Sequence, residues 1–163
     1  MDIIYNLGAN VVGRPTPSGP APLEEVKAIT QVGSAHGIDL EKITSLRPDV
    51  ILGNHPMNWK DIPSIESIGA KVILTSANSV DDIKKQIQIF GALLEKEDKS
   101  KEIIQSIDEK INEIESKQQG EKKRVLLVYG APGTNMAALP NSLSGSILEL
   151  AGGINIASDY PKL

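Results

Sequence analysis

The sequence contains no cysteine and few aromatic residues: one Trp, one Phe and three Tyr among 163 residues. The absence of cysteine excludes disulfide frameworks, thiolate metal sites and cysteine nucleophiles. Apolar runs stay far below the roughly 20 residues that cross a bilayer, and the longest, 50–53 and 125–129, have the length of strands. The 17 basic and 21 acidic residues form no Lys/Arg-rich block, so nucleic acid is not an expected partner.

What is present is the composition of a folded globular chain, with 40% hydrophobic and 23% charged residues. The residues after Met1 have neither the basic nor the apolar region of a signal peptide. Either the protein is cytoplasmic or its export segment lies outside this chain.

Residues 1–78 contain the signals of a small α/β lobe. Asp39 is placed to cap a helix over 40–46, and Arg47-Pro48 ends that helix before a strand at 49–53. A helix at 61–68 then leads to a second strand at 71–75. Strand, helix and strand at this spacing predict a parallel βαβ unit. Before it, residues 2–8 read as a helix closed by Gly8.

Residues 79–119 predict a long helical segment. Ser79 opens a pattern of apolar residues with the 3.6-residue period, which runs to Leu94, pauses over 95–100 and resumes over 104–114. A helix of that length is typical of a bridge between two bodies. Residues 120–163 then predict a strand at 124–129 and a helix at 142–151, too little to close a hydrophobic core alone.

A glycine-containing segment, Gly130–Met136, follows the strand at 124–129. It resembles a phosphate-binding loop but lacks the lysine and the Ser/Thr hydroxyl that such loops need. A turn that exposes backbone is therefore favoured, and a cytoplasmic nucleotide-binding domain or enzyme using the Gly130–Gly133 loop is kept as the alternative. No Gly-x-Ser-x-Gly elbow or recognisable carboxylate pair occurs, so we predict no enzymatic activity.

The two histidines are candidates because of their positions. His55 directly follows the strand at 49–53, and His36 precedes the helix that leads into the same strand. Loop histidines are most often simply solvated. No His/Asp/Glu set with metal-ligand spacing joins them, so a closed zinc site is not expected.

The segment Val32-Gly-Ser-Ala-His-Gly-Ile-Asp-Leu-Glu-Lys-Ile-Thr-Ser-Leu-Arg-Pro-Asp-Val-Ile-Leu52 resembles the substrate-binding proteins of bacterial ABC importers for iron-siderophores, haem and cobalamin. Residues 65–73, 80–94 and 145–157 match the same family in order. The resemblance implies the class III periplasmic-binding-protein fold, in which a parallel-sheet α/β lobe is joined by a long bridging helix to a second α/β lobe and the ligand sits between the lobes. It also implies a non-enzymatic, extracytoplasmic, periplasmic or surface lipoprotein that delivers its ligand to a membrane permease.

The resemblance further implies that a first strand and a signal segment precede Met1 and that the second lobe continues beyond Leu163. We expect the sheet edges left unpaired in this way to favour intermolecular pairing with another copy.

For the site, the resemblance implies haem or a ferric siderophore as transported ligand, with no catalytic cofactor. In the haem-binding branch, the residue at the position of His36 supplies an axial iron ligand, and imidazole is competent for that role. Haem is favoured over anionic siderophores because Arg14 is the only arginine placed to clamp a carboxylate or catecholate. Asp61 is a candidate for docking on the permease. The predicted ligand-binding residues are Arg14, His36, Gly37, His55, Met57, Trp59, Tyr129, Met136 and Asn141.

Overall fold

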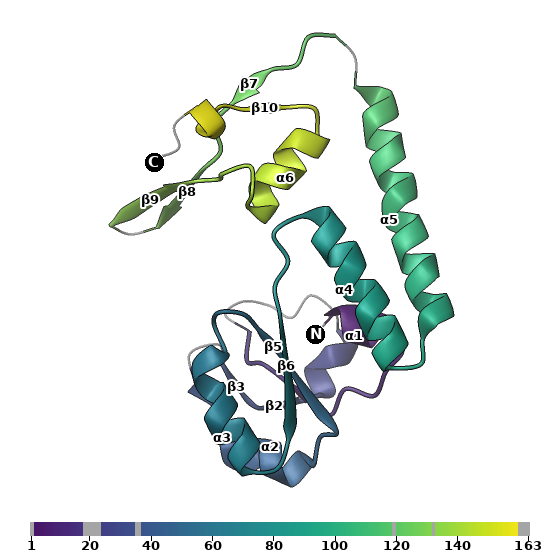
Figure 1. Ribbon diagram of the computed structural model, residues 1–163, viewed down its shortest axis with the longest axis vertical. Coiled ribbons are helices and arrows are strands. Elements are labelled where there is room, and N and C mark those ends of the chain that lie inside the picture. The colour runs from purple at the N-terminus through teal and green to yellow at the C-terminus, as the bar shows by residue number, and fades with distance from the viewer. Residues whose placement is uncertain (1, 18–23, 35–36, 119, 132, 160–163) are drawn as a thin grey trace. The chain divides into compact units, whose positions relative to one another are not determined.

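The computed structural model describes residues 2–17, 24–34, 37–118, 120–131 and 133–159. The chain divides into two compact units, Met1–Ser76 and Ala77–Leu163. Their helices and strands are drawn in Figure 1. The long helical segment predicted from sequence falls within the second unit.

The centre of the first unit is a pair of parallel strands, β5 (Val50–Asn54) and β6 (Lys71–Thr75). Val50 lies opposite Lys71 and Asn54 opposite Thr75, so both strands end at the same edge. The connection contains the 3-10 helix η2 (Trp59–Asp61) and the helix α3 (Ile62–Ser67). The predicted parallel βαβ unit is confirmed (Figure 1).

Helix α2 (Leu40–Leu46) forms where its capping signal predicts it. The Asp39 carboxylate accepts a hydrogen bond of 3.0 Å from the backbone N–H of Lys42, which satisfies one of the free donors of the first turn. This bond, with the Lys42 ammonium, lowers the pKa of Asp39. Arg47, in the left-handed conformation with φ 47°, ends the helix.

The rest of the first unit consists of short elements around this core. Helix α1 (Asp2–Asn6) is followed by Gly8 at φ 77°, as the C-terminal glycine predicts. The buried apolar side chains are Leu7, Val26, Ile43 and Ile65. The other elements are β1 (Gly13–Arg14) parallel to β2 (Thr30–Gln31), the 3-10 helix η1 (Glu25–Ala28), and β3 (Gly33–Ser34) antiparallel to β4 (Gly37–Ile38).

The second unit begins with two helices, α4 (Val80–Leu93) and α5 (Glu97–Lys117), which lie side by side as a hairpin (Figure 1). The Ser79 hydroxyl caps α4 by accepting from the N–H of Asp82 at 3.0 Å, as predicted. The long helical segment predicted over 79–119 is helical as expected but consists of two helices and not one, because the chain reverses between them.

The reversal is a Schellman turn at the end of α4. Glu95 adopts φ 56°, its N–H donates to the carbonyl of Ala92, and the N–H of Lys96 donates to the carbonyl of Gly91 at 2.7 Å. Glycine or asparagine usually occupies the left-handed position of such a turn, and a glutamate there leaves no sequence signal. In the sequence, the polar stretch after Leu94 therefore indicates only a pause in one helix.

The remainder of the second unit differs from the predicted strand over 124–129. That segment is divided between β7 (Arg124–Val125) and β8 (Val128–Ala131), and β8 pairs antiparallel with β9 (Thr134–Ala137). Gly130 thus lies within a hairpin strand, opposite Asn135. Gly133, at φ 84°, lies in the turn between β8 and β9, which agrees with the favoured interpretation of this segment as a turn. The turn leads into a strand and not into a helix, unlike a phosphate-binding loop.

Helix α6 (Leu143–Leu150) follows the hairpin and leads to β10 (Ile154–Asn155) and the 3-10 helix η3 (Ile156–Asp159). β10 pairs parallel with β7. Asn155 is 3% exposed, and its amide donates to the carbonyl of Ala138 while its oxygen accepts from the N–H of Ala157. This buried amide ties the end of the hairpin to the last strand.

Candidate functional site

The best-defined candidate site is the loop at the carboxyl end of β5, residues 54–61, which we term the ligand loop. Carboxyl ends of parallel strands are where open α/β sheets bind ligands. The His55 and Trp59 rings meet edge to face, with centroids 5.5 Å apart and planes at 61°. Trp59 is 63% and Met57 49% exposed, and His55 is also exposed. An imidazole, an indole and a thioether are thus presented to solvent within five residues.

Backbone hydrogen bonds hold this loop at its start and within it. The N–H of His55 donates to the carbonyl of Thr75 at 2.9 Å, which ties the loop to the end of β6. The N–H of Trp59 donates to the carbonyl of Pro56 at 3.2 Å, and the His55–Pro56 peptide bond is cis. Of the three residues predicted here, His55 and Trp59 are in contact, and Met57 lies exposed between them in the chain.

Asp61 differs from the other candidates because it is buried, at 9% exposure. Its Oδ2 accepts a hydrogen bond of 3.0 Å from the side-chain amide of Asn58. The carboxylate therefore holds the loop internally, whatever else it contacts. Its predicted docking on a permease stays a prediction.

Sequence reasoning overlooked Asn54 and Asn58 in this loop. The Asn58 side-chain oxygen accepts from the N–H of Asn54 at 2.9 Å. Asn and Asp side chains commonly bond nearby backbone in turns. The Asn-Asn-Asp spacing over 54, 58 and 61, just after a strand, is the signal that could have indicated this.

His36 lies outside the described residues, so its predicted role stays a prediction. On either side of it, Ser34 and Gly37 face each other in the β3–β4 hairpin. Gly37 is exposed, and a Cβ added there would meet nothing within 4 Å.

Arg14 is buried, at 4% exposure, rather than presented to solvent. Its guanidinium donates to the carbonyls of Pro15 and Lys27 at 3.3 and 3.5 Å, and its Nε has no hydrogen-bond partner. In this arrangement, Arg14 is therefore not presented to a ligand anion.

In the second unit, the structure brings two of the three predicted residues together. Tyr129 of β8 lies directly opposite Met136 of β9, and both are more than half exposed, at 65% and 52%. Asn141 is exposed in the turn before α6 and is not part of this pair.

Within the part of the chain that the structure describes, no three His, Asp or Glu side chains gather as a metal ion would require. No helix in the same ranges has both the length and the apolar character needed to cross a membrane. The exposed candidate side chains are His55, Met57 and Trp59 on the ligand loop of the first unit and Tyr129 and Met136 on the β8–β9 hairpin of the second.

Comparison with known proteins places these features in a family. The high-affinity heme uptake system protein IsdE of Staphylococcus aureus is 24% identical over 148 residues, which are 90% of this chain and 50% of that protein. The chain thus spans about half the length of the curated relatives it matches.

Solved structures share the fold. The iron uptake ABC transporter substrate-binding protein PiuA from Streptococcus pneumoniae aligns with a TM-score of 0.70 and 31% identity, over 83% of this chain and 50% of that chain. The periplasmic heme-binding protein HutB of Vibrio cholerae aligns with a TM-score of 0.81 and 19% identity, over 99% of this chain and 63% of that chain. A family model described as periplasmic binding protein matches residues 1–162, and the chain therefore belongs to the periplasmic binding protein family.

Proposed function

We propose that this chain is the solute-binding part of a bacterial ABC importer, which binds haem outside the cytoplasm and passes it to a membrane permease. It acts as a receptor without catalysis, since such a site needs only shape and a few polar anchors. The observation that carries the proposal is the exposed group of His55, Met57 and Trp59 at the carboxyl end of β5, in a chain of this family. A surface lipoprotein is the form in which we expect the whole protein to act.

Haem is the ligand that these side chains suit best. A flat macrocycle gains from apolar contact with Trp59 and Met57, and its iron accepts imidazole nitrogen. An anionic siderophore is best held by guanidinium groups that face it, whereas Arg14 is buried and the exposed Arg124 is paired with Asp159 at 3.0 Å. The exposed Arg47 ends α2, before the amino end of β5 and therefore at the opposite end of that strand from the ligand loop. The names of IsdE and HutB, which refer to heme, agree with this choice.

The remaining predicted residues have roles in the same proposal. His36 is the proposed axial ligand of the haem iron, with Gly37 beside it leaving room for the macrocycle. Tyr129, Met136 and Asn141 are the proposed ligand contacts on the second unit, and Asp61 is the proposed permease contact.

The test is a haemin titration of the full chain followed by Soret absorbance. We expect a saturable shift of the Soret maximum in the wild type and its loss in His36→Ala, because removal of the axial nitrogen changes the iron coordination. An unchanged maximum and affinity in His36→Ala would remove His36 from the site.

Parallel titrations separate the other possible ligands. The single Trp59 reports binding by fluorescence, so a ferric catecholate and cyanocobalamin are titrated under the same conditions. If the protein bound one of these two ligands and did not bind haemin, that ligand would replace haem in the proposal. Binding of ATP without any of the three would overturn the receptor proposal.

A further inference from the structure

The Asn58 side chain joins the two ends of the ligand loop. Its Oδ1 accepts from the backbone N–H of Asn54, the last residue of β5, at 2.9 Å. Its Nδ2 donates to Oδ2 of Asp61, the last residue of η2, at 3.0 Å. One amide thus spans from the end of the strand to the residue that precedes α3.

The backbone of Asn58 reinforces the same closure. Its N–H donates to the carbonyl of Asn54 at 2.8 Å, and its carbonyl accepts from the N–H of Asp61 at 3.0 Å. Asn58 therefore makes four hydrogen bonds to two residues, two through its side chain and two through its backbone. His55 and Trp59, the two rings in contact, lie on the segment that these bonds enclose.

Gly53 permits this closure sterically. A Cβ at position 53 would lie 3.2 Å from the Cβ of Asn58 and 2.7 Å from Cδ2 of Leu74. Both distances are tighter than ordinary van der Waals contact. A side chain at residue 53 would therefore require Leu74 and Asn58 to shift, and its absence lets the loop fold back closely on β5.

We infer that Asn58 is a positioning residue for ligand binding, which holds the ligand loop so that His55 and Trp59 are presented in one arrangement before the ligand arrives. The inference rests on the proposed function for the role of these rings. Its physical basis is pre-organisation: a loop that is already ordered loses less conformational entropy on binding.

The chemistry of the position specifies an amide. The side chain must accept from an N–H and donate to a carboxylate at once, which Asn does with its carbonyl and NH₂ groups. Aspartate accepts but does not donate, so Asn58→Asp sets two carboxylates against each other. Alanine removes both bonds and takes the Asn58 donor from the buried Asp61 carboxylate, which is costly for a group shielded from water.

The exchange of the two residues restores the network. In Asn58→Asp/Asp61→Asn, the carboxylate at 58 accepts from the N–H of Asn54 and from the amide at 61. Both side-chain bonds are then kept with the donor and acceptor reversed. If the single variants lose haemin affinity and the double variant recovers it, the cause is the hydrogen-bond network and not the size of the side chain at position 58.

The experiment measures haemin affinity and Trp59 fluorescence in the wild type, Asn58→Ala, Asn58→Asp and the exchanged pair. We expect haemin binding to weaken about tenfold or more in both single variants and to recover in the double variant. Acrylamide quenching of Trp59 fluorescence, measured without ligand, is expected to increase in the single variants and to return to the wild-type value in the double variant. Asn10→Ala, an exposed asparagine elsewhere in the first unit, is the matched control and leaves both quantities unchanged.

Circular dichroism tests whether each variant is folded. An unfolded single variant is replaced by Asn58→Ser, which shortens the side chain and retains a hydroxyl. Unchanged haemin affinity and quenching in folded single variants would overturn the inference while leaving the proposed function intact. Failure of the wild type to bind haemin would count against the proposed function alone, because Trp59 quenching tests the loop without ligand.

Discussion

Gly91 of α4 and Ser100 of α5 lie against each other, so close that a Cβ at position 91 would be 2.5 Å from the Cβ of Ser100 and 2.6 Å from its Oγ. Both residues are buried, Ser100 at 3% exposure. The absence of a side chain at Gly91 therefore sets how closely the two helices approach.

The first prediction concerns this contact. Gly91→Ala is expected to lower the free energy of unfolding by about 1–2 kcal/mol, because overpacking in a core outweighs the gain of about 1 kcal/mol in helix propensity. Urea unfolding followed by circular dichroism measures the change. The double variant Gly91→Ala/Ser100→Gly places the glycine on α5 and the methyl group on α4. It is expected to recover most of the lost free energy of unfolding. A single variant as stable as the wild type would contradict the close approach.

The second prediction concerns the link that Lys84 makes between the same helices. Its ammonium lies 3.0 Å from Asp81 of α4 and 3.0 Å from Asp108 of α5, and these hydrogen bonds raise its pKa. Asp108→Asn is expected to cost about 0.5–1 kcal/mol, as for other partly exposed ion pairs, and less at high salt.

A double-mutant cycle with Lys84→Met isolates the interaction between the two side chains. Lys101→Met, which breaks an ion pair to Asp98 within α5, is the control for loss of a surface lysine. A coupling energy of zero between positions 84 and 108 would show that the pair does not stabilise the hairpin.

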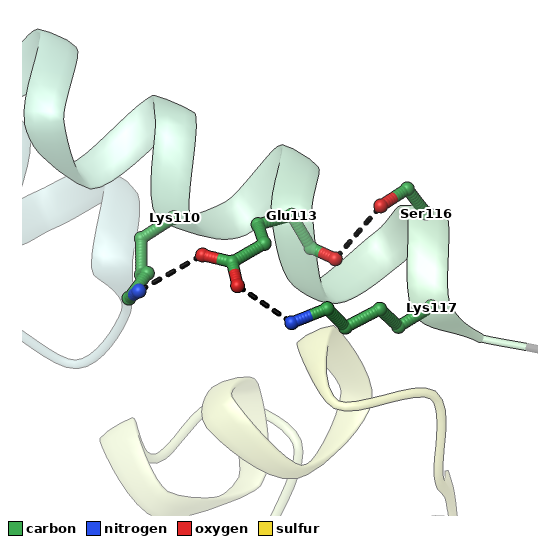
Figure 2. A network of polar contacts seen from close by, with 4 residues as sticks. All are labelled: Lys110, Glu113, Ser116 and Lys117. Carbon is green, nitrogen blue, oxygen red and sulfur yellow. Dashed lines mark hydrogen bonds and ion pairs between the residues drawn. The ribbon is translucent and has the colours of Figure 1, made fainter.

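The third prediction is a pH dependence at the end of α5. Figure 2 shows Glu113 between two lysines. Its carboxylate oxygens lie 2.8 Å from Nζ of Lys110 and 2.6 Å from Nζ of Lys117. These hydrogen bonds, that to Lys110 above all, lower the pKa of Glu113 below its ordinary value of 4.5. A carboxyl with a lowered folded pKa stabilises the fold above the unfolded pKa, and this contribution is lost as the pH falls through the folded pKa.

The comparison is between the wild type and Glu113→Gln in urea at several pH values. The wild type is expected to be the more stable above pH 4.5, and the difference is expected to shrink as the solution is acidified below that value. Glu115→Gln, on the same helix and without a resolved ion pair, is the control. A difference that does not vary with pH would refute the role of the Glu113 charge.

The fourth prediction concerns the exposed apolar segment around β7. Val125, Leu126, Leu127 and Val128 are 36–50% exposed, although a continuous apolar run is typical of a strand buried on both faces. We expect the sedimentation coefficient of the chain to rise with concentration, and Leu126→Lys to reduce that rise. A concentration-independent monomer would contradict this expectation.

Part of this molecule follows from local signals that the sequence carries by itself. Asp39 and Ser79 cap helices because their side chains reach N–H groups three residues ahead, wherever the helix packs. The parallel pair β5 and β6 follows from apolar runs joined by a helix, and that pattern places His55 at a strand end. The family resemblance, read from residues 32–52, is confirmed by the family match.

The tertiary structure decided the rest, because each remaining feature depends on groups that meet only after folding. The hairpin of α4 and α5 needs Glu95 in a left-handed conformation, which is a small cost offset by the contact of Gly91 with Ser100. The burial of Arg14 and the bonds of Asn58 depend on carbonyls and side chains that the folded loops bring within reach. Periodicity and capping report on a single element, whereas a loop's shape depends on what the rest of the unit packs against it.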